Sequence, residues 1–469
     1  MSGNSTFDVA VIGAGSAGFS AAITAADEGA QVALIGHDTI GGTCVNVGCV
    51  PSKALIRAAE TLHIASAAER FNGIEASAKV TDWQAVVRQK QELVDDLRKA
   101  KYSDLLPAYN SVSYLDGKAA FSDDGTLLVD GDVINASKVI IATGARAALP
   151  SIKGIEGVPY LTSTTALELE TLPESLLVIG AGYIGAEIAQ VFARAGVKVT
   201  IISRRGLLPE AEPEIGIALT GYFEDEGITL ISGISYSRIE QRDGSIVLTV
   251  QESGNPREIS AEKVLVATGR TPNVESLNLD GAGIDTNRFG GVKVDEQMCT
   301  TRKNVYAAGD VTGRDQFVYM AAYGAKVAAK NAMKSNSLSY DNSAMPAVVF
   351  TDPQMASVGL TEAQAMEQYE NVLTSILTLD NMPRALAARD TRGLIKLVAD
   401  GETKKLLGAH ILAPEGSDSI QTAVLAIKAG MTYDDLGAMI FPYLTTVEGL
   451  KLAAQTFNMD VKKLSCCAG

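Results

Sequence analysis

This chain has few cysteines, no block of basic residues and no long apolar run. Its five cysteines among 469 residues are too few for a disulfide scaffold. Its 40 Lys and Arg are outnumbered by 55 Asp and Glu, and the net charge of -15 argues against nucleic acid and anionic membranes as partners. No apolar stretch reaches the length of a membrane span, and the N-terminal residues lack the order of a signal peptide. We therefore predict a cytoplasmic protein without membrane insertion, in which paired cysteines serve chemistry.

Two segments carry the G-x-G-x-x-G pattern of a dinucleotide site. Residues 7–36 read as a strand, a glycine turn, a helix and a second strand, and residues 175–203 repeat this order. The glycines are Gly13, Gly15 and Gly18 in the first turn and Gly180, Gly182 and Gly185 in the second. They suit a tight turn, close approach to a pyrophosphate and packing of helix on strand. Plain strand-to-helix connections are the alternative, but each turn follows a strand and opens a helix, so two dinucleotides are expected.

In each of the two segments, the residues that follow the second strand indicate which dinucleotide binds. In the later segment Ser203, Arg204 and Arg205 follow the strand, and no carboxylate is present to accept a ribose 2′-hydroxyl. Two guanidinium groups suit a 2′-phosphate, which indicates NADPH; a solvated arginine pair is the alternative. The first site should then hold FAD, although its expected acid is also missing and Asp38 is the candidate substitute.

A cysteine pair lies in GGTCVNVGCVPSK, residues 41–53. Cys44 and Cys49 are followed by Pro51 and a helix-favouring run, so Cys49 should lie at a helix N-terminus, which favours a thiolate. The spacing is too long for a thioredoxin-like C-x-x-C, and no second Cys/His pair is near to complete a zinc site. A reversible disulfide is therefore predicted, with two unpaired structural cysteines as the alternative.

The composition, 46% hydrophobic and 20% charged, is typical of a globular protein and suits several domains at this length. VIIATGARA (139–147) and VLVATGRTPN (264–273) should return the chain to a nucleotide sheet, and NVYAAGDVTG places Asp310 after a short strand. We predict an FAD domain over residues 1–150 and 271–344, an NADPH domain over 151–270, and an α+β domain over 345–469.

Together these motifs resemble the flavoprotein pyridine-nucleotide disulfide oxidoreductases across essentially the whole chain. The resemblance implies an α/β fold with two Rossmann-like domains, binding FAD and NADPH, and a C-terminal α+β dimerisation domain. It implies a homodimer whose active site is completed by the partner's last domain. Cys44 would be the outer, exchanging thiol, Cys49 would stack against the flavin, and Lys53 and Glu187 would form an ion pair beside it. The family's cofactor positions match Gly13, Gly15, Ala17, Gly18, Gly42, Thr43, Lys53, Thr143, Gly144 and Asp310, and Gly180, Gly182, Gly185, Arg204, Arg205 and Gly269.

The chain departs from family members that reduce substrate disulfides. Those members carry a His, Pro, Thr stretch with a Glu behind it, whereas YLTTVEGL has Tyr443 in the histidine position and keeps Glu448. The chain has only three histidines, in a loop (His37), in a helical run (His63) and in a strand-like run (His410), and none suits the role. We expect a chain that can form a dithiol but lacks the proton shuttle for cleaving a disulfide.

The C-terminal tail, VKKLSCCAG, ends with adjacent Cys466 and Cys467. Adjacent cysteines form only a strained disulfide ring, so two thiols on a mobile arm suit transfer of a soft metal; an incidental tail is the alternative. Tyr443 and this tail resemble the branch of the family that reduces mercuric ion. That resemblance implies that Cys466 and Cys467 of one subunit pass Hg(II) to Cys44 and Cys49 of the other.

Two tyrosines match the active-site tyrosines of that branch, Tyr183 and Tyr443. Each phenol could donate to a thiolate or approach the metal, and Tyr183 equally suits a lid over the nicotinamide pocket. A large-type thioredoxin reductase is the second enzyme candidate, and a soft-metal buffer or redox sensor without turnover is the candidate from another class. Cys299 is expected to be an unpaired small residue. The chain starts at the flavin strand, so a short member or a catalytic core is expected.

Overall fold

The structure is a computed structural model that describes residues 6–463. The chain forms two compact units. One contains the residues up to Ala54, Ala85–Ala148 and Gly269–Asp341, and the other contains Leu55–Gln84, Leu149–Thr268 and the chain from Asn342 onward. We describe each unit separately.

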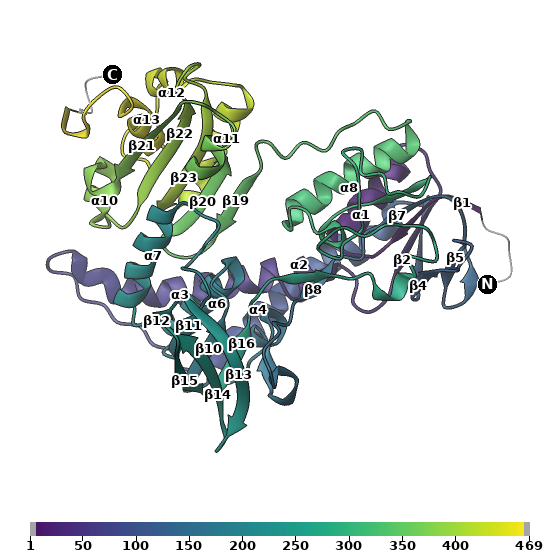
Figure 1. The fold of residues 1–469 in the computed structure, drawn as a ribbon, viewed down its shortest axis with the longest axis horizontal. Coiled ribbons are helices and arrows are strands. Elements are labelled where there is room, and N and C mark those ends of the chain that lie inside the picture. Colours follow the sequence, from purple (N-terminus) through teal and green to yellow (C-terminus); the bar gives the residue numbers. More distant parts are fainter. Residues whose placement is uncertain (1–5, 464–469) are drawn as a thin grey trace. The chain divides into compact units, whose positions relative to one another are not determined.

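The first unit is built on a five-stranded parallel sheet (Figure 1). The strand order is β18 (Val305–Ala307), β7 (Asn135–Ile141), β1 (Thr6–Ile12), β2 (Val32–Gly36) and β3 (Val112–Asp116). The central strands are apolar and buried on both faces, as expected for a parallel sheet covered by helices. Helix α1 (Ser16–Asp27) packs beside α8 (Val318–Met333), and their small buried alanines allow close approach.

Smaller elements complete this unit. A three-stranded antiparallel sheet contains β4 (Ala119–Phe121), β5 (Leu127–Val129) and β6 (Asp132–Val133), and β8 (Ala145–Ala147) pairs antiparallel with β17 (Arg270–Pro272). The cysteine segment forms α2 (Gly42–Asn46) and the start of α3 (Cys49–Ser66), and α4 (Trp83–Arg98) follows later. The β8–β17 pair joins the two ATG segments, which are far apart in the sequence.

The second unit contains another parallel sheet, in the order β12 (Thr229–Ile231), β11 (Lys198–Ile202), β10 (Ser175–Ile179), β16 (Lys263–Val266) and β9 (Tyr160–Leu161). An antiparallel sheet of β13 (Ile234–Arg242), β14 (Ser245–Glu252) and β15 (Asn255–Ala261) packs with it through an aliphatic core. The helices of this part are α5 (Ser163–Ala166), α6 (Tyr183–Arg194) and α7 (Pro213–Asp225).

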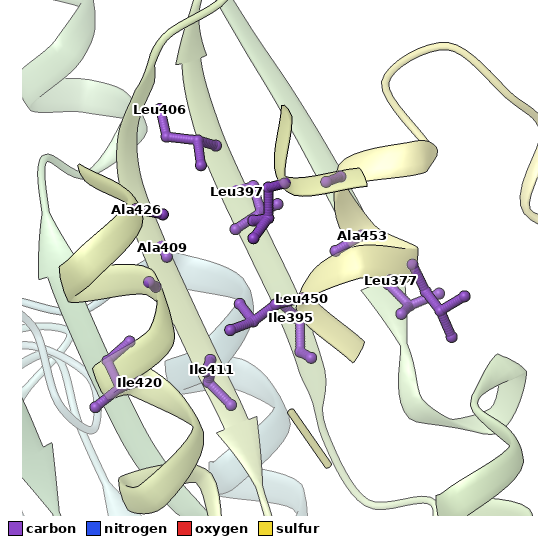
Figure 2. Close-up of a cluster of buried hydrophobic side chains, with 14 of the residues drawn as sticks. Leu377, Ile395, Leu397, Leu406, Ala409, Ile411, Ile420, Ala426, Leu450 and Ala453 are labelled. Atoms are coloured by element: carbon purple, nitrogen blue, oxygen red, sulfur yellow. The ribbon is translucent and has the colours of Figure 1, made fainter. Parts of the chain in front are cut away.

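A five-stranded antiparallel sheet in the second unit is formed by the C-terminal residues. Its order is β19 (Pro346–Val349), β20 (Gln354–Gly359), β23 (Leu406–Ala413), β22 (Leu394–Asp400) and β21 (Val372–Thr378). Its helices are α9 (Glu362–Met366), α10 (Pro383–Ala388), α11 (Gly416–Lys428), α12 (Tyr433–Ala438) and α13 (Glu448–Gln455). Figure 2 shows Ile420 of α11 and Leu450 of α13 packed against Ile395 and Ile411 of the strands.

The predicted fold class is confirmed, with two Rossmann-like sheets and a C-terminal α+β domain. None of the helices within residues 6–463 has both the length and the apolar character needed to cross a membrane.

Candidate functional site

The first glycine turn leaves no room for side chains at two of its positions. A Cβ on Gly13, whose φ is +115°, would lie 2.3 Å from the carbonyl oxygen of Ala142, and one on Gly18 would lie 1.7 Å from that of Gly13. Helix α1 then begins at Ser16 without an acidic residue in its first turn. Its N–H groups and its positive dipole end therefore suit a phosphate anion, so the turn fits the pyrophosphate of a dinucleotide.

The segment before the cysteines is attached to this turn. Gly41 and Gly42 have positive φ, and a Cβ on Gly42 would lie 2.6 Å from the Cα of Gly15. The N–H of Gly41 donates to the carbonyl of Ala14 at 2.9 Å. Thr43 and Cys44 follow in α2, so backbone contacts fix the dithiol segment directly on the first nucleotide turn.

The two cysteines are in contact. Cys44 lies in α2, and α3 begins at Cys49 as predicted. The Cys44 thiol is hydrogen-bonded to Cys49, and this bond, together with burial and the charge of Cys49, raises the pKa of Cys44, while Lys53 lowers it. The raised pKa favours the protonated form of Cys44, and the start of α3 at Cys49 is a position where a helix dipole favours a thiolate.

Asn46 holds the turn between the two cysteines. Its amide nitrogen donates to the carbonyls of Ile40 and Gly42, both at 2.9 Å, and its oxygen accepts from Arg98 at 3.1 Å. At the other end of the turn, the N–H of Ser52 donates to the carbonyl of Gly48 at 3.0 Å. The spacing of four residues is thus kept by side-chain bonds as well as by the two helices.

Tyr102 is a residue at this site that sequence reasoning missed. Its hydroxyl lies 3.2 Å from Ser16 Oγ, and its ring packs edge-on against Phe19 with centroids 4.8 Å apart. Burial raises the pKa of Tyr102, and the charges of Cys44 and Cys49 raise it further. The phenol therefore stays protonated near both thiols. No motif surrounds Tyr102, and its partner Ser16 is 86 residues away, so local sequence gave no signal.

The remaining predicted flavin positions lie at the ends of β7 and β18. Thr143 Oγ1 donates to the carbonyl of Asn273 at 2.6 Å, and Gly144 has a φ of +71° with open space above it. Asp310 lies at this edge, and burial raises the pKa of its carboxyl. The charge of Arg270, whose Nε is 3.3 Å from Asp310 Oδ2, partly offsets this rise. Gly269, which belongs to the second set of predicted cofactor positions, lies just before β17 and has a φ of +111° with open space around it. A carboxylate at this edge fits hydrogen bonding to a ribityl hydroxyl.

His37 and Asp38 directly follow β2, the second strand of the first nucleotide motif. Their side chains are paired at 2.6 Å and exposed, and Asp38 has a φ of +64°. The candidate ribose acceptor is therefore a solvent-facing carboxylate after β2.

The second glycine turn, in the other unit, has the same construction. A Cβ on Gly180 would lie 2.3 Å from the carbonyl oxygen of Ala267, and one on Gly185 would lie 2.2 Å from that of Gly180, whereas Gly182 faces open space. Tyr183 opens α6, and burial raises its pKa. Glu187 is buried one turn later and accepts a hydrogen bond from the N–H of Phe350 at 2.8 Å. Its ion pair with Lys53 stays a prediction.

The two arginines after β11 differ in their surroundings. Arg205 forms an ion pair with Glu210, whereas Arg204 forms no ion pair in the part of the chain described. The pKa of Tyr236 is raised by burial, and the positive charge of Arg204 opposes this rise in part. Arg204 is thus available to an anion near Tyr236, and Arg205 already has a carboxylate partner.

Tyr443 and Glu448 lie near the C-terminus of the second unit. Tyr443 is 54% exposed, and the next residue, Leu444, donates its N–H to the buried carboxylate of Glu448 at 3.1 Å. The carboxylate that would orient a histidine in disulfide-reducing relatives here supports the backbone beside a tyrosine. Cys466 and Cys467 lie outside the described residues. Within 6–463 no three His, Cys, Asp or Glu side chains gather as a metal site.

The histidines are placed as the sequence predicted. His63 lies in α3 and His410 in β23, where burial lowers the pKa of each. His410 is buried, with Nε2 at 3.0 Å from the carbonyl of Leu360, so it acts as a core residue.

Comparison with known proteins agrees with this geometry. Residues 7–329 match the family described as "Pyridine nucleotide-disulphide oxidoreductase", and 345–454 match its dimerisation domain. Mercuric reductase from Lysinibacillus sphaericus is 46% identical, covering 99% of this chain and 85% of that protein, and the one from Streptomyces lividans is 45% identical, covering 99% and 98%. The Cu(II) complex of the HOCl-induced flavoprotein disulfide reductase RclA from Escherichia coli is 31% identical with a TM-score of 0.85, covering 96% of this chain and 99% of RclA. The chain therefore belongs to the pyridine nucleotide-disulphide oxidoreductase family and, within it, to the mercuric reductases.

Proposed function

We propose that this protein reduces Hg(II) to Hg(0) with electrons from NADPH, by way of FAD and the pair Cys44 and Cys49. The observation that carries the proposal is the contact between these two thiols in a segment fixed on a dinucleotide turn. The reaction balances as Hg(II) plus NADPH giving Hg(0), NADP⁺ and one proton. Hg(II) is a soft cation that prefers two thiolates, which this pair can supply.

The residues around both glycine turns fit the two cofactors. For FAD we propose Gly13, Gly15, Ala17, Gly18, Gly42, Thr43, Lys53, Thr143, Gly144 and Asp310, and for NADPH Gly180, Gly182, Gly185, Arg204, Arg205 and Gly269. When bound, NADPH would supply hydride to the flavin, and the flavin would supply two electrons to the dithiol side. The chain's own task is to hold the thiols, donate N–H groups to the phosphates and favour loss of the thiol proton when Hg(II) binds.

Proton handling at the dithiol follows from its hydrogen bond. The raised pKa of Cys44 favours its protonated form in the metal-free pair, and Hg(II) binding would displace that proton to leave two thiolates. The positive charge of Lys53 favours this loss. No leaving thiolate needs protonation in this reaction, so Tyr443 in place of a histidine is consistent with it. As the family resemblance implies, Tyr183 and the partner subunit's Tyr443 would each donate to a thiolate or approach the metal, and Tyr183 equally suits a lid over the nicotinamide pocket.

Delivery is proposed to use a homodimer. Cys466 and Cys467 of the partner subunit would collect Hg(II) and pass it to Cys44 and Cys49 by thiolate exchange, which needs no redox step. The match of residues 345–454 to the dimerisation domain supports the dimer. The family of the chain and its two cofactor sites also suit a large-type thioredoxin reductase or a thiol-based metal buffer without turnover, so the acceptor must be tested.

An NADPH-consumption assay with five arms separates these functions. The arms are Hg(II) on excess small thiol, Cu(II) on the same thiol, glutathione disulfide, thioredoxin and no acceptor. We expect fast oxidation of NADPH only with Hg(II), accompanied by release of volatile mercury. Preferred turnover of glutathione disulfide or thioredoxin would establish a disulfide reductase, and no turnover with any acceptor would establish the buffer.

A further inference from the structure

We propose that Glu210 is a specificity-determining residue that competes with the 2′-phosphate of NADPH for Arg205, so that Arg204 supplies most of the phosphate affinity. This inference rests on the NADPH site proposed above. It goes beyond that proposal because it gives the two arginines unequal roles and assigns one to a carboxylate of the chain itself.

The segment from Ser203 to Glu210 is held against the second glycine turn. The N–H of Leu208 donates to the carbonyl of Ala181 at 2.9 Å, and Leu207 and Leu208 are both buried. The N–H of Arg205 donates to the buried Ser203 Oγ at 3.2 Å. The backbone at both arginines is therefore fixed near Gly182, which faces open space.

Glu210 acts on both Arg205 and Tyr183, the first residue of α6. Its carboxylate forms the ion pair with Arg205, and its charge also raises the pKa of Tyr183 beyond the effect of burial. A carboxylate in this position attracts the Arg205 guanidinium and repels an incoming phosphate. The pair is exposed, at 65% and 71% for the two side chains, so it is weak enough to exchange with a ligand.

Arg204 faces a different environment. Its charge acts on the phenol of Tyr236 in β13, and no carboxylate within residues 6–463 pairs with it. A phosphate that approaches Arg204 therefore displaces no internal partner. A phosphate that approaches Arg205 must first replace Glu210.

Calorimetric titration of the FAD-loaded protein tests this with two small probes, 2′,5′-ADP and 5′-AMP. The Glu210→Gln variant should bind 2′,5′-ADP about threefold to fivefold more tightly, the range expected for an exposed ion pair, with 5′-AMP unchanged. Arg204→Gln should weaken 2′,5′-ADP about tenfold or more, whereas Arg205→Gln in the parent protein should change it by less than about twofold. In the Glu210→Gln background, Arg205→Gln should abolish the gain.

Glu224→Gln is the matched control, because it removes the same charge from an exposed position on α7 without touching Arg205. An unchanged affinity of Glu210→Gln for 2′,5′-ADP, an equal gain with Glu224→Gln, or equal losses in the two arginine variants would each overturn the competition. If the parent protein binds both probes equally and Arg204→Gln has no effect, the NADPH assignment itself fails, and the inference fails with it.

Discussion

Cys44 and Cys49 differ in their surroundings although both are partly buried thiol side chains. Cys49 begins α3, where the helix dipole favours negative charge, and the hydrogen bond between the two thiols raises the pKa of Cys44. Removal of Cys44 therefore deletes one metal ligand and this hydrogen bond, while Cys49 stays at its helix end. The flavin-side residues around Gly13 and Asp310 are not touched by this change.

The Cys44→Ala variant is expected to lose mercury-dependent NADPH oxidation by about a thousandfold or more, because one thiolate cannot hold Hg(II) as the pair does. Its flavin absorbance should be unchanged. Cys299→Ala is the control, since Cys299 interacts with Asp295 and not with the dithiol, and it should keep the parent rate. Steady-state rates with Hg(II) on excess thiol measure both. Turnover retained in Cys44→Ala would contradict the dithiol mechanism.

At single residues, the sequence predicted interactions between residues that are close in the chain and missed those between residues that are far apart in it. The glycines and cysteines act within a few residues of one another, so their spacing alone indicated the turns and the helix start at Cys49. Tyr102 contacts Ser16 across 86 residues, and no local pattern marks it. Glu210 lies only five residues after Arg205, but an arginine pair by itself indicates a phosphate site, and no local pattern shows that a carboxylate pairs with one of the two arginines.

At the scale of elements, the second unit contains a buried charge cluster that joins α7 to β22. Lys396 is 1% exposed, and its ammonium donates to Glu212 at 2.9 Å, Glu214 at 2.9 Å and Glu362 at 2.7 Å. Lys396 lies in the apolar run LIKLVAD, which indicates a strand but no charged partner. The carboxylates that neutralise Lys396 lie up to 184 residues away, so the cluster was not predictable from local sequence.

Lys396→Met should destabilise the protein by about 3–5 kcal/mol, because the buried carboxylate of Glu212 would lose its cation. The thermal midpoint should fall by roughly 10 °C. Lys404→Met is the control, since Lys404 forms one exposed pair with Asp434, and its midpoint should stay within about 2 °C of the parent. Differential scanning calorimetry at neutral pH compares them. Equal midpoints for the two variants would show that the cluster contributes no net stability.

At the scale of the whole molecule, a short segment near the C-terminus is both apolar and exposed. Ile440 is 97% exposed and Tyr443 54%, with Met439 and Leu444 exposed beside them, in the part that matches the dimerisation domain. Contiguous exposed apolar residues are typical of an interaction surface. The fold of each sheet was predictable from its own strands, whereas the pairing of subunits depends on surfaces that the local sequence pattern does not mark.

Hybrid dimers test whether the tail serves the other subunit. One subunit carries Cys44→Ala with an intact tail, and the other carries Cys466→Ala and Cys467→Ala with an intact dithiol, each with a different affinity tag. If the tail delivers Hg(II) across the dimer, this hybrid keeps one complete site and should show about half the parent rate with Hg(II) on competing thiols. The converse hybrid, a parent subunit paired with one that carries all three substitutions, should be nearly inactive, because its only dithiol faces a tail without cysteines. The reverse pattern of rates would show that each tail serves its own subunit.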